Sequence, residues 1–255
     1  MIDWVLTTTN LTGNEFIALT IIVTLAGVIR GFSGFALSGL VMATAIFILP
    51  PIALIPMLWW LEMAASLLLV KGGWQDADRK TTFGLVGASI IGWPLGLTAM
   101  TALAEDTSKI VALAIVVALA VSQLIKVKLP FLATKPGLYT AGLTAGIVSG
   151  LSSVGPMVIA LFFLAKETPA RMMRGSIVLF LFLSSILSFF IQLAFGVMDF
   201  SGVARGLVFA APTALGVAIG LQMFTVRFEP YYRPVCLGLL ISLACFGLVR
   251  QVVAL

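Results

Sequence analysis

Two charged side chains interrupt long apolar stretches of this 255-residue sequence. Arg30 stands in the apolar stretch 15–49, and Glu62 stands in the next one, 52–70. A cation at the centre of a bilayer costs about 2.5 to 3.5 kcal/mol on insertion scales, so Arg30 should have a partner that offsets this cost. A guanidinium binds a sulfonate or carboxylate through two parallel hydrogen bonds. Arg30 is therefore a candidate anion ligand. The alternative is a basic residue at the cytoplasmic tip of a hairpin.

The sequence leaves three roles open for Glu62. Burial favours the protonated form of a carboxyl group, so Glu62 could bind a proton and couple transport to a proton gradient. It could instead form an ion pair with Arg30, or face a cavity without taking part in chemistry. Trp59 and Trp60 come just before it and are candidates for a cavity wall, although aromatic residues in such segments more often serve packing. Gln123 and Gln192 are expected to hydrogen-bond to neighbouring helices.

Small residues follow Arg30, and a similar group recurs later in the chain. Glycine lets a ligand approach the backbone, and a helix that begins after it offers free N–H groups and about half a positive charge to an anion. Serine adds hydroxyl donors. The alternative is that these small residues only allow close helix packing. The predicted substrate-binding residues are Arg30, Gly31, Ser33, Gly34, Gly150, Ser152, Ser153 and Gly155.

The two groups of small residues belong to an internal duplication. Residues 26–34 match residues 145–153, a shift of 119 positions. Pro50 and Pro169 keep this shift, as do Ser66 and Ser185. Duplicated membrane proteins place their substrate site where the copies meet. We therefore divide the chain into a first repeat, 1–125, a cytoplasmic linker, 126–136, and a second repeat, 137–255, within one integrated membrane domain.

The composition indicates that these residues are positioned by membrane-spanning helices. Hydrophobic residues make up 61% of the chain and charged residues 10%, where a soluble domain carries about 25% charged residues. The chain has no histidine and two cysteines, so we expect no metal site, no cofactor and no enzyme activity. The net charge is +5, and the basic residues lie between the apolar stretches, as expected of cytoplasmic loops. The charge therefore does not indicate nucleic-acid binding.

Two of the apolar stretches, 15–49 and 137–165, are too long for one span and are interrupted by glycines. The pieces on either side have about 12 to 15 residues, or about 20 Å, against a bilayer core of about 30 Å. Unwound backbone between them must face protein or a wet cavity. We therefore predict an all-α polytopic membrane protein with two repeats, each a glycine-broken hairpin plus three transmembrane helices. An odd number of crossings per repeat gives the two copies inverted topology.

The distribution of basic residues supports this layout. If both termini lie outside the cell, the predicted crossings make four loops cytoplasmic: 71–82, 126–136, 166–174 and 227–233. These loops hold eleven basic residues, against three on the opposite face, as the positive-inside rule requires. The run from Asp76 to Lys80 is expected to be a solvated loop. The eleven residues are Lys71, Arg79, Lys80, Lys126, Lys128, Lys135, Lys166, Arg171, Arg174, Arg227 and Arg233.

The glycine-rich break in each half, the second of which runs from Gly146 to Pro156, resembles that of the TauE/SafE family. The resemblance covers the whole chain and implies a transporter of the bacterial inner membrane for sulfite, sulfonates and related small anions. The chain departs from the family pattern at Ala36, Ser38 and Ser153, where the family tends to have glycine.

We therefore expect a secondary transporter that moves a small sulfur oxyanion by alternating access, with its site between the two breaks. An anion channel on the same duplicated frame is the alternative. The expected partners are the anion, the lipid bilayer, a coupling proton and, through the small residues Gly84, Gly87 and Ser89, a second copy of the chain. Both termini are predicted to be periplasmic.

Overall fold

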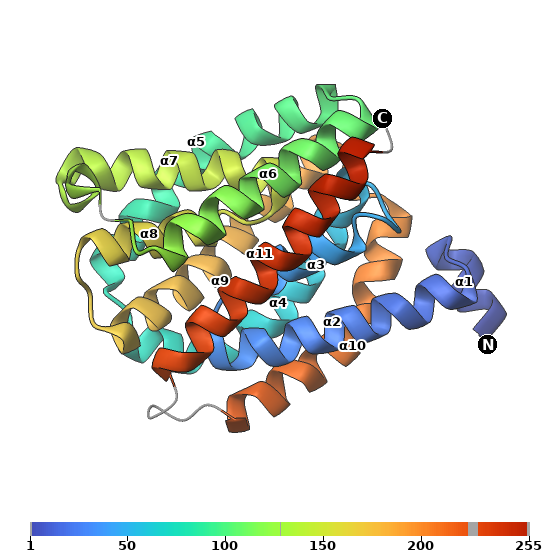
Figure 1. The fold of residues 1–255 in the computed structure, drawn as a ribbon, viewed down its shortest axis with the longest axis horizontal. Coiled ribbons are helices and arrows are strands. Elements are labelled where there is room, and N and C mark those ends of the chain that lie inside the picture. Colours follow the sequence, from blue (N-terminus) through green and yellow to red (C-terminus); the bar gives the residue numbers. More distant parts are fainter. Residues whose placement is uncertain (1, 128, 224–228, 254–255) are drawn as a thin grey trace.

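The computed structural model describes residues 2–127, 129–223 and 229–253, and all its regular elements are helices (Figure 1). The basic residues Lys128 and Arg227, which entered the charge count, lie outside the described residues. In chain order the helices are α1 (Ile2–Thr9), α2 (Gly13–Ser33), α3 (Leu37–Ala45), α4 (Pro51–Asp76), α5 (Arg79–Ala102), α6 (Glu105–Leu124), the 3-10 helix η1 (Pro130–Ala133), α7 (Lys135–Ser152), α8 (Pro156–Ala165), α9 (Ala170–Ala194), α10 (Phe200–Met223) and α11 (Glu229–Val253).

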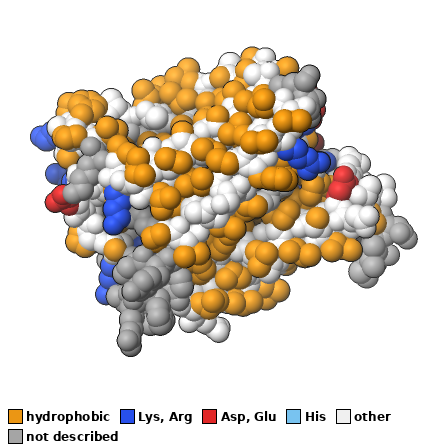
Figure 2. All heavy atoms as spheres, in the orientation of Figure 1, with side chains coloured by type: hydrophobic (Ala, Val, Ile, Leu, Met, Phe, Trp, Pro, Cys, Tyr) orange, Lys and Arg blue, Asp and Glu red, His pale blue; other side chains and the backbone are white. Residues whose placement is uncertain are grey.

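Seven of the described helices are long and apolar enough to cross a membrane: α2, α4, α5, α6, α9, α10 and the part of α11 from Pro234 to Val253. The surface agrees with this assignment, because hydrophobic side chains cover much of the face seen in Figure 2, and Lys and Arg gather toward its two ends. The chain is therefore a multi-pass membrane protein. Its outer surface is solvated by lipid rather than water.

Both predicted breaks are present, and they fall at equivalent positions. The first lies between Ser33 and Leu37, and the second between Ser152 and Pro156, again a shift of 119 residues. Each begins with a left-handed residue, Gly34 (φ 79°) in the first and Ser153 (φ 57°) in the second. A left-handed residue ends a helix because the next N–H turns away from the helical ladder.

The predicted lengths of the broken pieces were wrong. The first arm of each hairpin has 21 residues in α2 and 18 in α7, while the second arm has only 9 in α3 and 10 in α8. Gly27 and Gly31 do not end α2, because a glycine costs a helix only about 1 kcal/mol and here allows close packing against α10. The break therefore comes later than the first glycines suggest.

Glycines bring two pairs of parallel helices into close contact. A Cβ atom on Gly27 would overlap the carbonyl oxygen of Thr213, and one on Gly31 would overlap that of Val217, so α2 and α10 run in the same direction. The pair α5 and α7 is built in the same way. This packing occupies Gly84 and Ser89, so the flank that we expected to contact a second copy is largely used inside the molecule.

Two further pairs are antiparallel, and each joins helices at equivalent places in the two halves. In α4 and α9, Trp59 Nε1 donates to the Ser185 carbonyl at 2.7 Å, while Gly73 lies against Val178. In α6 and α11, Gln251 Nε2 donates to Asp106 Oδ1 at 3.0 Å. The two halves are thus in contact through several pairs of helices, α4 and α9 in particular.

The segment from Asp76 to Lys80 is not a free loop, which corrects the sequence-based expectation. Asp76 accepts a hydrogen bond from Arg171 Nε at 3.0 Å, and Asp78 accepts one from Lys166 Nζ at 3.3 Å. Burial alone would raise the pKa of Asp78, but hydrogen bonds from Thr81 and the Lys166 ammonium hold this pKa below its usual value. These contacts tie the end of α4 to the segment around the start of α9.

Candidate functional site

Arg30 is fully buried, and each of its guanidinium nitrogens faces an oxygen atom. Its Nε lies 3.1 Å from Glu62 Oε2, one terminal nitrogen donates to the Gly34 carbonyl, and the other donates to Ser66 Oγ at 3.4 Å. The ion pair between Arg30 and Glu62 is therefore confirmed among the alternatives that the sequence left open. Because a buried charge is tolerated only when it is paired and hydrogen-bonded, Glu62 accounts for the presence of Arg30.

Glu62 also occupies the start of α3. Its Oε1 accepts a hydrogen bond from the Ser38 hydroxyl at 2.6 Å and from the Ser38 N–H at 3.3 Å. The N-terminus of a helix attracts negative charge, and in α3 the carboxylate of Glu62 supplies it. Arg30, Glu62 and Ser38 thus form one connected buried cluster that links both sides of the first break to α4.

The second half lacks this cluster and has a cavity instead. At the repeat shift of 119 residues, Ser149 stands in place of Arg30, and Leu181 stands in place of Glu62. Both of these residues line a cavity of about 40 Å³. The loss of a long cation and a carboxylate removes both the volume and the charge that fill the equivalent position in the first half.

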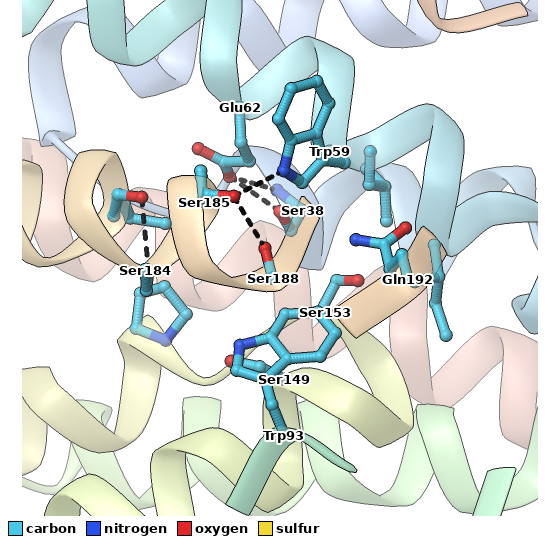
Figure 3. A pocket seen from close by; sticks show the side chains of 14 residues that line it. Ser38, Trp59, Glu62, Trp93, Ser149, Ser153, Ser184, Ser185, Ser188 and Gln192 are labelled. Carbon is cyan, nitrogen blue, oxygen red and sulfur yellow. Dashed lines mark hydrogen bonds between the residues drawn. The ribbon is translucent and has the colours of Figure 1, made fainter. Parts of the chain in front are cut away.

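This cavity lies between α3, α4, α5, α9 and the second break (Figure 3). A smaller space of about 10 Å³ shares five of its lining residues and is lined by Ala36 of the first break and Val154 of the second. Residues of both breaks therefore line this neighbouring space. The lining residues of the larger cavity are Ser38, Ile55, Leu58, Trp59, Glu62, Trp93, Ser149, Ser153, Pro156, Leu181, Ser184, Ser185, Ser188 and Gln192.

The cavity wall is rich in serine hydroxyl groups. Six serines line it, and several of them already donate a hydrogen bond within the protein. The Ser184 hydroxyl donates to the Leu181 carbonyl at 3.3 Å, and the Ser188 hydroxyl donates to the Ser185 carbonyl at 3.1 Å. Such hydroxyls can rotate toward a ligand, since each bond is a local one to the preceding turn of α9.

Gln192 lines the cavity with a buried side-chain amide that makes no hydrogen bond to the described residues. It is fully buried, and both Oε1 and Nε2 are without a hydrogen-bond partner among the described residues. The expectation that it bonds to a neighbouring helix was wrong. Gln123 does so, because its Nε2 donates to the Met157 carbonyl at 3.2 Å.

Of the predicted site residues, Ser153, Glu62 and Trp59 line the cavity. Arg30 lies behind Glu62, and its direct contact with an anion stays a prediction. Trp60 turns away from the cavity and packs against Gly206 in α10.

The remaining predicted residues surround the breaks without lining the cavity. Gly31 and Gly150 are at close helix contacts, with a Cβ on Gly150 coming 2.5 Å from Leu97 N. Gly34 lies against the side chain of Arg174, and Gly155 lies against Ser149. The hydroxyl groups of Ser33 and Ser152 donate to the carbonyls of Phe35 and Val148, at 2.5 and 3.1 Å.

Sequence reasoning did not assign Ser184, Ser185, Ser188 and Gln192 to the site. A signal for them exists in the sequence, because Leu181 to Gln192 spans about three helical turns, and these four polar residues follow helical spacing within an apolar segment. Ser38 was noted only as a departure from a glycine pattern. Ser149 is brought to the cavity by the packing of α7 on α5 and could not be assigned from local sequence, whereas Trp93 is a further tryptophan of the kind expected in a cavity wall.

The donor set also bears on which groups the site can hold. Among the described residues, no cluster of three or more His, Cys, Asp or Glu side chains is close enough to hold a metal ion. The cavity offers hydroxyls, one amide and one carboxylate, which suit a small polar ligand held by hydrogen bonds.

Comparison with known proteins gives one result. A family model described as "Sulfite exporter TauE/SafE" matches residues 19–246. These residues include both breaks and all the cavity-lining residues. No curated protein and no solved structure gives a significant match.

Proposed function

The chain belongs to the sulfite exporter TauE/SafE family, and from this premise we propose that it is a secondary transporter with its substrate site in the serine-lined cavity. Family membership implies membrane transport of sulfur anions such as sulfite, and members are transporters rather than enzymes. The finer proposal is that a sulfite or sulfonate anion crosses a bacterial inner membrane by alternating access. The observation that carries it is the polar cavity between the two breaks.

Inverted topology of the two repeats, 1–125 and 137–255, is part of this proposal. The equivalent helices α4 and α9 are antiparallel, and so are α6 and α11. A pseudo-two-fold axis in the membrane plane that relates the two repeats would make equivalent helices antiparallel. In Figure 1, α1 and the end of α11 also lie toward the same side of the molecule, which supports placing both termini on the periplasmic face.

Alternating access requires contacts between the halves that can break on one face. Arg174, at the start of α9, donates to the Gly31 carbonyl in α2 at 2.8 Å. Together with the Asp76–Arg171 and Asp78–Lys166 pairs, it joins the halves near the basic loops. In this proposal these contacts close the cytoplasmic face. Glu62, which lines the cavity, is the group that would bind a coupling proton.

The proposal is tested by sulfite binding to the purified full chain. Sulfite at about 100 times its dissociation constant should add about 2.7 kcal/mol to the free energy of unfolding, seen as a higher melting temperature. Ser188→Ala should weaken sulfite binding by up to about tenfold, because one hydrogen bond contributes about 0.5 to 1.5 kcal/mol. Ser122→Ala is the matched control, since the Ser122 hydroxyl also bonds to its own helix but lies outside the cavity lining.

Transport by reconstituted vesicles then separates the carrier from the channel. A carrier should exchange labelled sulfite for internal sulfite and saturate at low rates. Flux orders of magnitude faster, without exchange, would identify a channel instead. Absence of both sulfite binding and sulfite flux would contradict the assignment of the cavity.

A further inference from the structure

We propose that Gln192 makes the site selective for an anion with a single negative charge and at least one hydrogen-bond donor of its own. This inference rests on the proposed function and specifies the ligand class for the same cavity. Three observations support it: the side-chain amide of Gln192 is unpaired, several serine hydroxyls of the wall donate to other groups of the protein, and the Arg30–Glu62 pair beside the cavity has no net charge.

Gln192 offers both a donor and an acceptor to the cavity. Its side chain is fully buried on α9, neither amide atom is paired among the described residues, and Figure 3 shows it pointing toward the centre of the lining residues. Leaving a buried polar atom unpaired costs about 1 to 3 kcal/mol, so a ligand that bonds to both atoms removes a large penalty. An oxyanion oxygen can accept from Nε2, but only a ligand donor can satisfy Oε1.

Three serines of the wall also present acceptors in the arrangement that the structure shows. The Ser38 hydroxyl proton is directed to Glu62, and the hydroxyl protons of Ser184 and Ser188 are directed to backbone carbonyls. Their free lone pairs, together with the Glu62 carboxylate, remain available as acceptors. A ligand that carries only acceptors would require these hydroxyls to turn away from their present partners, whereas one hydroxyl or a bound proton on the ligand would pair with their lone pairs directly.

The charge of the surroundings limits the ligand to one negative charge. Among the described residues no lysine or arginine lines the cavity, and the buried cation of the neighbouring cluster, Arg30, is already paired with Glu62. The desolvation cost of an ion rises with the square of its charge, so a dianion pays about four times the cost of a monoanion in such a site. Hydroxyl and amide dipoles can offset the smaller cost but not the larger one.

Three ligands test this inference on the purified full chain. Ethanesulfonate and 2-hydroxyethanesulfonate have the same charge and differ by one hydroxyl group, while sulfate carries two charges. Trp59 and Trp93 line the cavity, so intrinsic fluorescence should report binding. We expect 2-hydroxyethanesulfonate to bind about tenfold more tightly than ethanesulfonate, and sulfate to bind more weakly than either.

The Gln192→Leu variant tests the residue assignment. It should bind the two sulfonates with nearly equal affinity, because it lacks the amide oxygen that accepts a hydrogen bond from the ligand hydroxyl. Gln123→Leu removes a similarly buried amide outside the cavity lining and should keep the wild-type preference. Melting temperatures of both variants establish whether they fold. The comparison of ligand affinities for the wild type tests the inference even if neither variant folds.

The outcomes separate this inference from the proposed function. Equal affinities of the wild type for the two sulfonates, or tighter binding of sulfate, would overturn the inference while leaving a sulfur-anion site. A preference that survives in Gln192→Leu would overturn the role of Gln192. If none of these ligands nor sulfite binds, the proposed function and the inference fail together.

Discussion

Arg30 and Glu62 form a buried ion pair that contacts both sides of the first break. Arg30 joins Glu62 to the Gly34 carbonyl, and Glu62 joins the start of α3 through Ser38. The pair therefore fixes both ends of the break against α4. A buried pair contributes little net stability compared with apolar residues of similar size, but removal of one partner leaves an uncompensated charge.

Substitution of Arg30 alone should be much more harmful than substitution of the pair. Arg30→Met leaves Glu62 buried without its cation and should lower the free energy of unfolding by about 3 to 5 kcal/mol. The double variant Arg30→Met, Glu62→Met should recover most of this loss. Denaturant unfolding in detergent measures both values. Equal destabilisation by the single and double variants would show that the two side chains act independently.

Glycine stripes determine how closely the helices of the two halves pack. In α5, Gly92 and Gly96 face the backbone of α7, whereas a methyl group added to Gly87 would have no neighbouring atom within 4 Å. The same helix thus has glycines that are required for packing and one that is not. Small residues serve membrane helices in this way because lipid tails give no hydrophobic drive for association, and close van der Waals contact must supply it.

Alanine substitution in α5 should separate these two kinds of glycine. A methyl group on Gly96 would overlap the Ile147 carbonyl, so Gly96→Ala should force α5 and α7 apart and destabilise the protein by about 1 to 3 kcal/mol. Gly87→Ala should be neutral or slightly stabilising, because alanine favours the helix. Thermal unfolding of the two variants gives the comparison. A stable Gly96→Ala protein would mean that α5 and α7 are not in close contact.

The whole molecule combines a repeated frame with an asymmetric interior. The helix breaks recur at a shift of 119 residues, and equivalent helices pair across the halves. The first half fills the space beside its break with a salt bridge, and the second half leaves a serine-lined cavity there. The two charged residues in the first half suggested a site in that half. The proposed site instead belongs more to the second half.

The proposed topology can be tested with single cysteines at exposed positions. After replacement of Cys236 and Cys245 by alanine, Lys80→Cys should react with a membrane-impermeant maleimide only after the membrane is opened, because its loop is predicted to be cytoplasmic. Thr107→Cys, at the other end of the spans, should react in intact spheroplasts. Reaction of both cysteines from the same side would contradict the predicted number of crossings.

The sequence by itself determined the class of the protein, the existence of two breaks related by the repeat, and the family. Apolar stretches predict membrane helices because only helices and closed barrels satisfy the backbone inside a bilayer. The shift of 119 residues aligned Gly34 with Ser153, and both are left-handed residues in the structure. The pairing of Arg30 with Glu62 was among the alternatives because two buried opposite charges attract each other. These are local or nearly obligatory consequences of residue type.

Only the tertiary structure decided which residues share the cavity and which glycines pack. Ser38, Ser149 and Gln192 are on three different helices, and no spacing along the chain brings them together. Gly31 and Gly150 have the same local sequence character as Gly34 and Gly155, yet neighbouring helices place them in backbone contacts. The reason is physical: helix propensity and hydropathy act along the chain, whereas a cavity is the space that side chains from several helices fail to fill.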